Sequence, residues 1–164
     1  MATAAIYTND EPVSVYTRYG EPASQQLKAA GARWDPRERA WMAPVELVRR
    51  LAAAGIVEIT HDWTAMGTSE LIAYCEQTDE REPYWALARR IGDDLRELPY
   101  QLEFSVTGKS CWVGIETRAF AATLFARFDG QRLRFEVSLV DDVPPEVAEK
   151  FDVVAGQFNA ARKS

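Results

Sequence analysis

Five basic side chains and one tyrosine near the N-terminus have the types and spacing for contacts with nucleic acid. They are Lys28, Arg33, Arg37 and Arg39, with Arg18 and Tyr19 shortly before them. Lysine and arginine neutralise phosphates, and an exposed aromatic ring can stack on a base. We therefore predict a small basic edge that contacts a nucleic-acid backbone, with Tyr19 as its stacking side chain.

Acidic residues nearby support a different interpretation of the same stretch. Asp35 and Glu38 stand among the arginines, and residues 1–60 hold seven Lys/Arg against seven Asp/Glu, a net charge of zero. A strong nucleic-acid binder normally shows a clear basic surface. An ordinary solvated turn therefore remains an equally good interpretation of these charges.

No combination of residues predicts catalysis, a cofactor or a metal site. His61 is the only histidine and lacks the Cys/His spacing of a zinc site, so we expect it to be exposed in a connection. The residues TGKS at 107–110 match the end of a phosphate-binding loop. However, Glu103 stands where that motif needs glycine, and the residues that follow have the pattern of a strand. The sequence therefore predicts a protein that is not an enzyme.

The cysteines and the apolar runs indicate the compartment. Cys75 and Cys111 are far apart, make no disulfide framework and are expected to be small buried side chains. Residues 1–8 have no basic stretch followed by an apolar segment, and no run approaches the roughly 20 apolar residues of a membrane-spanning helix. We expect a cytoplasmic protein with no membrane partner.

The first sixty residues are predicted to form a compact α/β module that positions the basic side chains. Its elements are expected at residues 4–8 and 13–17 (strands), 23–30 (helix), 33–34 and 39–42 (hairpin), 44–54 (helix) and 56–60 (strand). Gly31 and Gly55 follow the two helices, where glycine accepts the left-handed conformation that ends a helix. The polar residues 61–68 are expected to be a linker.

The predicted hairpin contains two tryptophans. Asp35 can accept hydrogen bonds from backbone N–H groups two residues on, and Pro36 has the fixed φ that favours a turn. Trp34 and Trp41 flank this turn, so we expect them on neighbouring strands, where they share a face and pack on the short helices.

Residues 69–164 are predicted to form a second domain, and the whole chain belongs to the α+β class. Helices are expected from Thr68 or Ser69 to Gln77, from Pro83 to about residue 97, and from Pro144 to the C-terminal region. Between the last two, apolar residues alternate as in strands. Asp129-Gly130 predicts a two-residue type I′ hairpin turn. We expect helices packed on an antiparallel meander, with a C-terminal helix.

The stretch Leu27–Pro44, LKAAGARWDPRERAWMAP, is similar to a known family. It resembles the small "LKALGARWDPxxRxW" accessory domain of TraC-type plasmid primases and, more distantly, the HARP domain of annealing helicases. The resemblance covers roughly residues 4–60 and rests on Gly31, Trp34, the Asp35-Pro36 turn and Trp41. It implies a compact module beside DNA-processing enzymes of mobile elements. In the HARP relatives it implies binding to single-stranded or junction DNA.

Two functions remain open from the sequence. The first is a non-enzymatic accessory protein of a mobile element, phage or defence system that contacts DNA through the N-terminal module. The second is a protein-binding module or inhibitor, an acidic nucleic-acid mimic that engages a basic partner through residues 61–164. These residues hold twelve Lys/Arg against eighteen Asp/Glu, 12 − 18 = −6, which is the whole acidic excess. Metal-dependent hydrolysis by carboxylates that converge in space ranks last.

Overall fold

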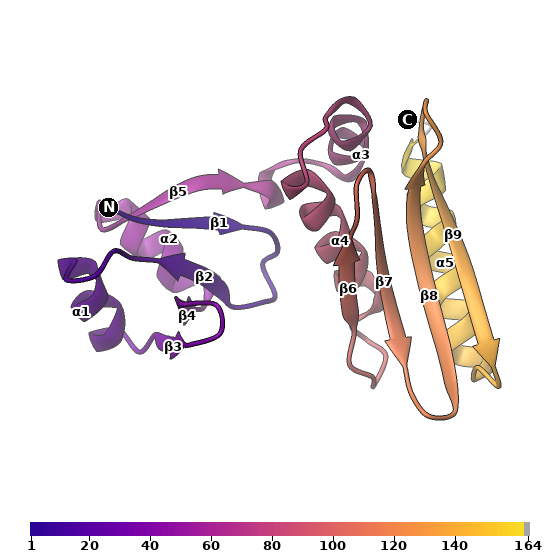
Figure 1. The fold of residues 1–164 in the computed structure, drawn as a ribbon, viewed down its shortest axis with the longest axis horizontal. Helices are drawn as coiled ribbons and strands as arrows, with labels where there is room; N and C mark the ends of the chain where they lie inside the picture. Colours follow the sequence, from indigo (N-terminus) through magenta and orange to yellow (C-terminus); the bar gives the residue numbers. More distant parts are fainter. Residues whose placement is uncertain (163–164) are drawn as a thin grey trace. The chain divides into compact units, whose positions relative to one another are not determined.

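Two separate sheets organise the chain, which is described here by a computed structural model over residues 1–162 (Figure 1). One sheet belongs to a unit formed by residues 1–65, and the other belongs to a unit that begins at Met66. Each sheet has helices against one face, so the predicted α+β class is confirmed. Residues 163 and 164, part of the predicted second domain, lie outside the described residues.

The first unit is a five-stranded sheet with two helices. Its elements are β1 (Ala2–Ile6), β2 (Val13–Tyr16), α1 (Pro22–Ala29), β3 (Arg33–Asp35), β4 (Ala40–Ala43), α2 (Val45–Ala53), β5 (Val57–Asp62) and the short 3-10 helix η1 (Trp63–Ala65). The strand order is β3-β4-β2-β1-β5. β1 and β5 are parallel, and the other neighbours are antiparallel.

Alternating apolar residues create the core of this unit. Val13 and Val15 of β2 are buried on the same sheet face as Leu27 of α1 and Val48 of α2, so both helices cover one face. Trp41 packs against this cluster while remaining partly exposed.

Glycines end both helices as predicted. Gly31 has a φ of 95°, the N–H of Ala32 donates to the carbonyl of Leu27 at 3.0 Å, and the N–H of Gly31 donates to Lys28 at 3.1 Å. This pair of bonds is the Schellman arrangement, which satisfies the last carbonyls and turns the chain sharply into β3. Gly55 repeats it after α2, with a φ of 77°.

The predicted linker at 61–68 is largely regular structure. β5 continues to Asp62, η1 covers Trp63–Ala65, and α3 begins at Thr68. The polar residues belong to a strand at the edge of the sheet. The register between β1 and β5 shifts between Ala4 and Ala5, and this bulge accommodates Thr60, whose hydroxyl donates to the carbonyl of Ala4 at 3.2 Å.

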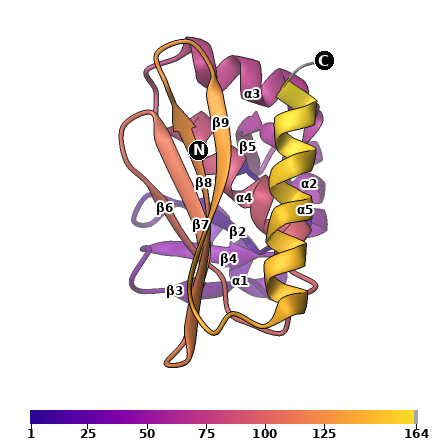
Figure 2. The ribbon, with the colours of Figure 1, turned by 90° about the vertical axis from the view of Figure 1, so that its right-hand side faces the viewer.

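The second unit is a four-stranded antiparallel meander covered by three helices. Its elements are α3 (Thr68–Gln77), α4 (Glu82–Leu95), β6 (Glu103–Val106), β7 (Ser110–Glu116), β8 (Phe120–Phe128), β9 (Leu133–Asp141) and α5 (Pro145–Arg162). The strand order is β6-β7-β8-β9. α4 lies against β6 and β7, and α5 lies against β8 and β9. Figure 2 shows α3, α4 and α5 on one side of these strands.

The apolar stripe predicted for the long helix is its buried face. Tyr84, Leu87, Ile91 and Leu95 of α4 are fully buried. In α5, residues four, three and four apart are buried in the same way: Val147, Phe151, Val154 and Phe158. The helical periodicity therefore identified the face of each helix that covers the sheet.

The hairpin between β8 and β9 forms where predicted, but the predicted type I′ turn is wrong. Phe128 pairs with Leu133, and only Gly130 of the turn has a positive φ, 100°. The Asp129 carboxylate explains the difference, because it accepts hydrogen bonds from the N–H groups of Gln131 and Arg132, each at 2.9 Å. The N–H of Asp129 also donates to the carbonyl of Arg132 at 3.0 Å, so Asp129 lies outside the central pair of the turn, which is Gly130 and Gln131.

Among the described residues, no helix is both long and apolar enough to cross a membrane.

Candidate nucleic-acid interface

The fold brings four of the six predicted contact residues to one end of the first sheet. β2 and β4 are antiparallel neighbours, so the C-terminal end of β2 adjoins the N-terminal end of β4. The loop after β2 and the turn before β4 therefore lie at the same sheet end. They carry Arg18 and Tyr19 after β2, and Arg37 and Arg39 before β4.

The other two predicted residues lie away from this end. α1 starts after the β2 loop and runs back along the sheet, so Lys28 in its last turn lies toward the opposite end. Arg33 opens β3, the outermost strand, and pairs with Met42 across to β4. The candidate interface thus includes one sheet end and extends along one sheet edge.

The basic side chains of this region are exposed and available. Lys28, Arg33, Arg37 and Arg39 are all exposed, as is Arg18. Within residues 1–162, none of these five side chains makes an ion pair or a hydrogen bond. A ligand phosphate could therefore approach them without displacing an internal partner.

Two of the three neighbouring carboxylates are engaged by backbone and terminal groups, whereas the Glu38 carboxylate is exposed and has no such contact within residues 1–162. Asp35 accepts hydrogen bonds from the N–H groups of Arg37 at 2.9 Å and Glu38 at 3.3 Å, as the sequence predicted. Glu21 accepts a bond from the N–H of Arg18, which lowers the pKa of Glu21, and pairs with the N-terminal amine at 3.1 Å.

The zero net charge of residues 1–60 conceals an uneven distribution. Residues 18–39 hold five Lys/Arg against three Asp/Glu. Asp10 and Glu11 lie in the loop between β1 and β2, at the opposite sheet end, and Glu58 lies on β5, at the opposite edge. Residues 18–39 therefore carry an excess of two positive charges, which comes from Lys28 and Arg33, because Arg18, Arg37 and Arg39 at the sheet end are matched in number by Glu21, Asp35 and Glu38.

Three exposed aromatic side chains accompany these cations. Tyr19 is fully exposed, Tyr16 is 47% exposed and Trp34 is 46% exposed. Sequence reasoning identified Tyr19 and missed the other two. The exposure of Tyr16 could have been predicted from the sequence. Side chains alternate between the two faces of a strand, so Tyr16 cannot share the buried face of Val13 and Val15.

The two tryptophans of the hairpin are direct neighbours, as predicted. Trp34 pairs with Trp41, and their ring centroids are 5.4 Å apart in an edge-to-face arrangement. The expectation that both would pack on the helices is wrong for Trp34. β3 is the outermost strand and nothing lies beyond it in the sheet, so the Trp34 ring keeps about half of its surface in solvent.

His61 is neither exposed nor part of a connection, contrary to our expectation. It lies in β5, is half-buried, and stacks on the buried Trp63 with ring centroids 3.7 Å apart. Within residues 1–162, no three His, Cys, Asp or Glu side chains gather as a metal site would require. The local role of His61 is therefore to pack against η1.

Comparisons with protein family models, with curated proteins and with solved structures give no match to this chain. The resemblance to primase-accessory and HARP domains therefore stays a prediction.

Proposed function

We propose that the first unit binds single-stranded nucleic acid along the sheet end and edge formed by β2, β3 and β4. The observation that carries this proposal is the presence, along this sheet end and edge, of three exposed aromatic rings and five exposed cations that make no ion pair or side-chain hydrogen bond within residues 1–162. They are Tyr16, Tyr19 and Trp34, with Arg18, Lys28, Arg33, Arg37 and Arg39.

Exposed aromatic rings together with basic side chains favour the binding of single strands over duplexes. Stacking of a base on an aromatic side chain contributes about 1–3 kcal/mol, and it requires an unstacked base. Arginines add sequence-independent contacts with phosphates. Single-stranded segments, and junctions that expose such segments, offer both features at once, whereas an intact duplex hides its base faces.

The unit acts in this proposal as a binding accessory rather than as an enzyme. The resemblance to accessory domains of plasmid primases supports a role beside the DNA-processing machinery of a mobile element, phage or defence system. Binding to an exposed strand is the activity that such a role needs.

Fluorescence anisotropy with labelled single-stranded and duplex DNA tests the proposal. The test variant combines Arg33→Ala, Arg37→Ala and Arg39→Gly, with glycine chosen at position 39 because the residue has a φ of 52°. A matched control combines Arg50→Ala, Arg118→Ala and Arg132→Ala, which removes three exposed arginines elsewhere.

We expect preferential binding of single strands by the wild-type protein and by the control variant. For single strands, the logarithm of the affinity falls with the logarithm of the salt concentration by about 0.7 per neutralised phosphate. The test variant loses three cations, so its plot of log affinity against log salt concentration should have a slope smaller in magnitude by about 2. Its affinity at low salt should fall at least tenfold. Absence of binding at tens of micromolar protein, or equal losses in both variants, would contradict the proposal.

A further inference from the structure

The helix-free face of the second sheet carries a hollow near the middle of β7. Residues of β7 alternate between the two faces, so Cys111, Val113 and Ile115 face the helices while Trp112 and Gly114 face the other way. Because glycine has no side chain, a depression remains between its neighbours. The hollow has a volume of about 240 Å³.

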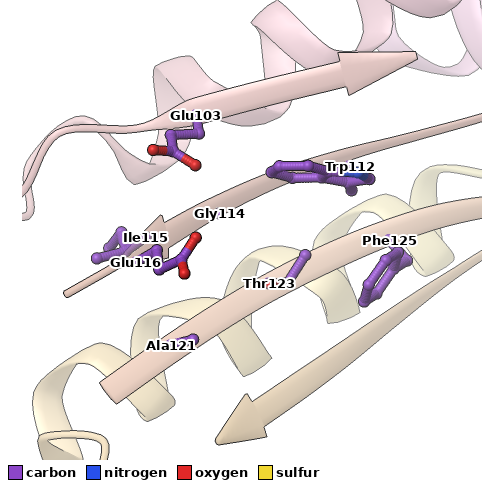
Figure 3. A pocket seen from close by; sticks show the side chains of 8 residues that line it. All are labelled: Glu103, Trp112, Gly114, Ile115, Glu116, Ala121, Thr123 and Phe125. Atoms are coloured by element: carbon purple, nitrogen blue, oxygen red, sulfur yellow. The ribbon is translucent and has the colours of Figure 1, made fainter. Parts of the chain in front are cut away.

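Two carboxylates and two aromatic rings surround this hollow (Figure 3). Glu103 of β6 pairs directly with Gly114, and Glu116 lies two residues further along β7 on the same face. Figure 3 shows both carboxylates extending toward the space beside Gly114. Trp112 lies at the other end, and Phe125 pairs with it from β8.

Neither carboxylate has a partner within the described part of the chain. Glu103 and Glu116 are both exposed, and neither accepts a hydrogen bond or forms an ion pair there. Two like charges that border one apolar depression repel each other, and a cation placed between them would relieve that repulsion. A positively charged group is therefore the ligand that complements this hollow.

The same row of aromatic rings already holds one arginine. The guanidinium carbon of Arg127 lies 4.3 Å from the centroid of the Phe125 ring. This contact places a guanidinium over an aromatic ring on this face. The Trp112 ring, on the opposite side of Phe125 from β9, has no such cation within residues 1–162.

We propose that this hollow receives an arginine side chain from a basic polypeptide partner. A guanidinium is planar, so it can stack on the Trp112 indole while its N–H groups donate to the Glu103 and Glu116 carboxylates. A lysine ammonium offers charge without the flat stacking surface, so arginine is the better match. The occupant is a protein because residues 61–164 carry a net charge of −6, which attracts a basic surface over a longer range.

Nuclear magnetic resonance titration of the whole protein tests the proposal with a short synthetic arginine-glycine-serine peptide as the probe. Two matched peptides carry lysine or the uncharged isostere citrulline in place of each arginine. The signals to follow are the Gly114 amide and the Trp112 indole N–H, because both groups line the hollow. We expect the arginine peptide to shift both signals at low salt and the citrulline peptide to leave them unchanged.

Variants separate the hollow from the general acidity of the unit. Glu103→Gln with Glu116→Gln preserves shape and should weaken binding of the arginine peptide by about tenfold or more. The matched control, Glu149→Gln with Asp152→Asn, removes two exposed charges from α5 and should change the affinity less than threefold, as a weak long-range effect.

Four results would overturn the proposal. They are no shift at millimolar peptide, equal binding of the citrulline or lysine peptide, equal weakening by the control variant, and shifts of the two signals on concentrating the protein without peptide. The last result would identify a second copy of this chain as the occupant.

Discussion

Trp34 and Trp41 lie directly opposite each other on β3 and β4, with their ring planes inclined by 67°, yet only Trp41 packs against the buried core. Trp41 packs against the cluster beneath α1 and α2, and Trp34 leans on the edge of its neighbour with 46% of its surface exposed. One tryptophan therefore packs on the core, and the other rests against it with about half of its surface in solvent.

Substitution of the two tryptophans separates stability from binding. Trp41→Ala leaves a cavity beside the helices and should lower the free energy of unfolding by about 2–4 kcal/mol. Trp34→Ala loses mainly the aromatic pair and should cost about 1 kcal/mol. Urea unfolding measures both values, and anisotropy with single-stranded DNA should show at least a fivefold loss of affinity for the Trp34 variant. Unchanged affinity in folded Trp34→Ala would remove this ring from the proposed interface.

Arg39 occupies a backbone conformation that suits glycine better. Its φ is 52°, in the left-handed region, where a side chain costs about 1–2 kcal/mol. Arg39→Gly should therefore raise the free energy of unfolding by about 0.5–1 kcal/mol, after the larger chain entropy of glycine is subtracted. The same variant should bind single-stranded DNA more weakly, because a phosphate contact is lost.

Arg37→Ala is the matched comparison for Arg39→Gly. Arg37 lies in the same turn without a positive φ, so this variant should lower affinity without a gain in stability. If Arg39→Gly is more stable and still binds single-stranded DNA with wild-type affinity, Arg39 does not contact the nucleic acid.

Local signals in the sequence predicted the elements well, because each depends on a few adjacent residues. Gly31 ends α1 because only glycine accepts its φ of 95° without strain, and that preference is visible without the fold. The alternation in β7 and β8 likewise predicts which residues face the helices. The type of the turn at Asp129 was harder to predict from the sequence, because the Asp129 carboxylate can stabilise two competing turn geometries.

The candidate sites depend on register and strand order, which the sequence does not display. Arg18 and Arg37 are brought to one sheet end because β2 and β4 are neighbours, although β3 comes between them in the chain. Glu103 faces Gly114 only through the pairing of β6 with β7. The exposure of Trp34 follows from the edge position of β3. In each case, the arrangement of the strands within the sheet determined the outcome, and the propensity of the single residue did not.

The two cysteines should be inert in the folded protein. Cys75 and Cys111 are buried free thiols, and burial raises the pKa of Cys75 to about 12 and that of Cys111 also well above its usual range. The thiolate is the reactive form, so a disulfide reagent at about pH 8 should label neither residue until the chain unfolds. Absorbance of the released thiol, followed with and without urea, measures this. Rapid labelling of one equivalent without urea would show that the second unit opens readily.

Two glycines in helices of the second unit should respond in opposite directions to alanine. A methyl group on Gly92 of α4 would lie 2.6 Å from Cε1 of Phe104, whose ring also has Arg89 stacked 4.1 Å from its centroid. Because that ring is confined, Gly92→Ala should lower the free energy of unfolding by about 1–2 kcal/mol. Gly156 of α5 is exposed, and a methyl group there meets nothing within 4 Å. Gly156→Ala should therefore raise stability by about 0.5–1 kcal/mol, from helix propensity alone. Chemical unfolding of both variants tests the pair. An unchanged or raised stability for Gly92→Ala would mean that Phe104 can move aside, and that α4 does not pack closely on β6.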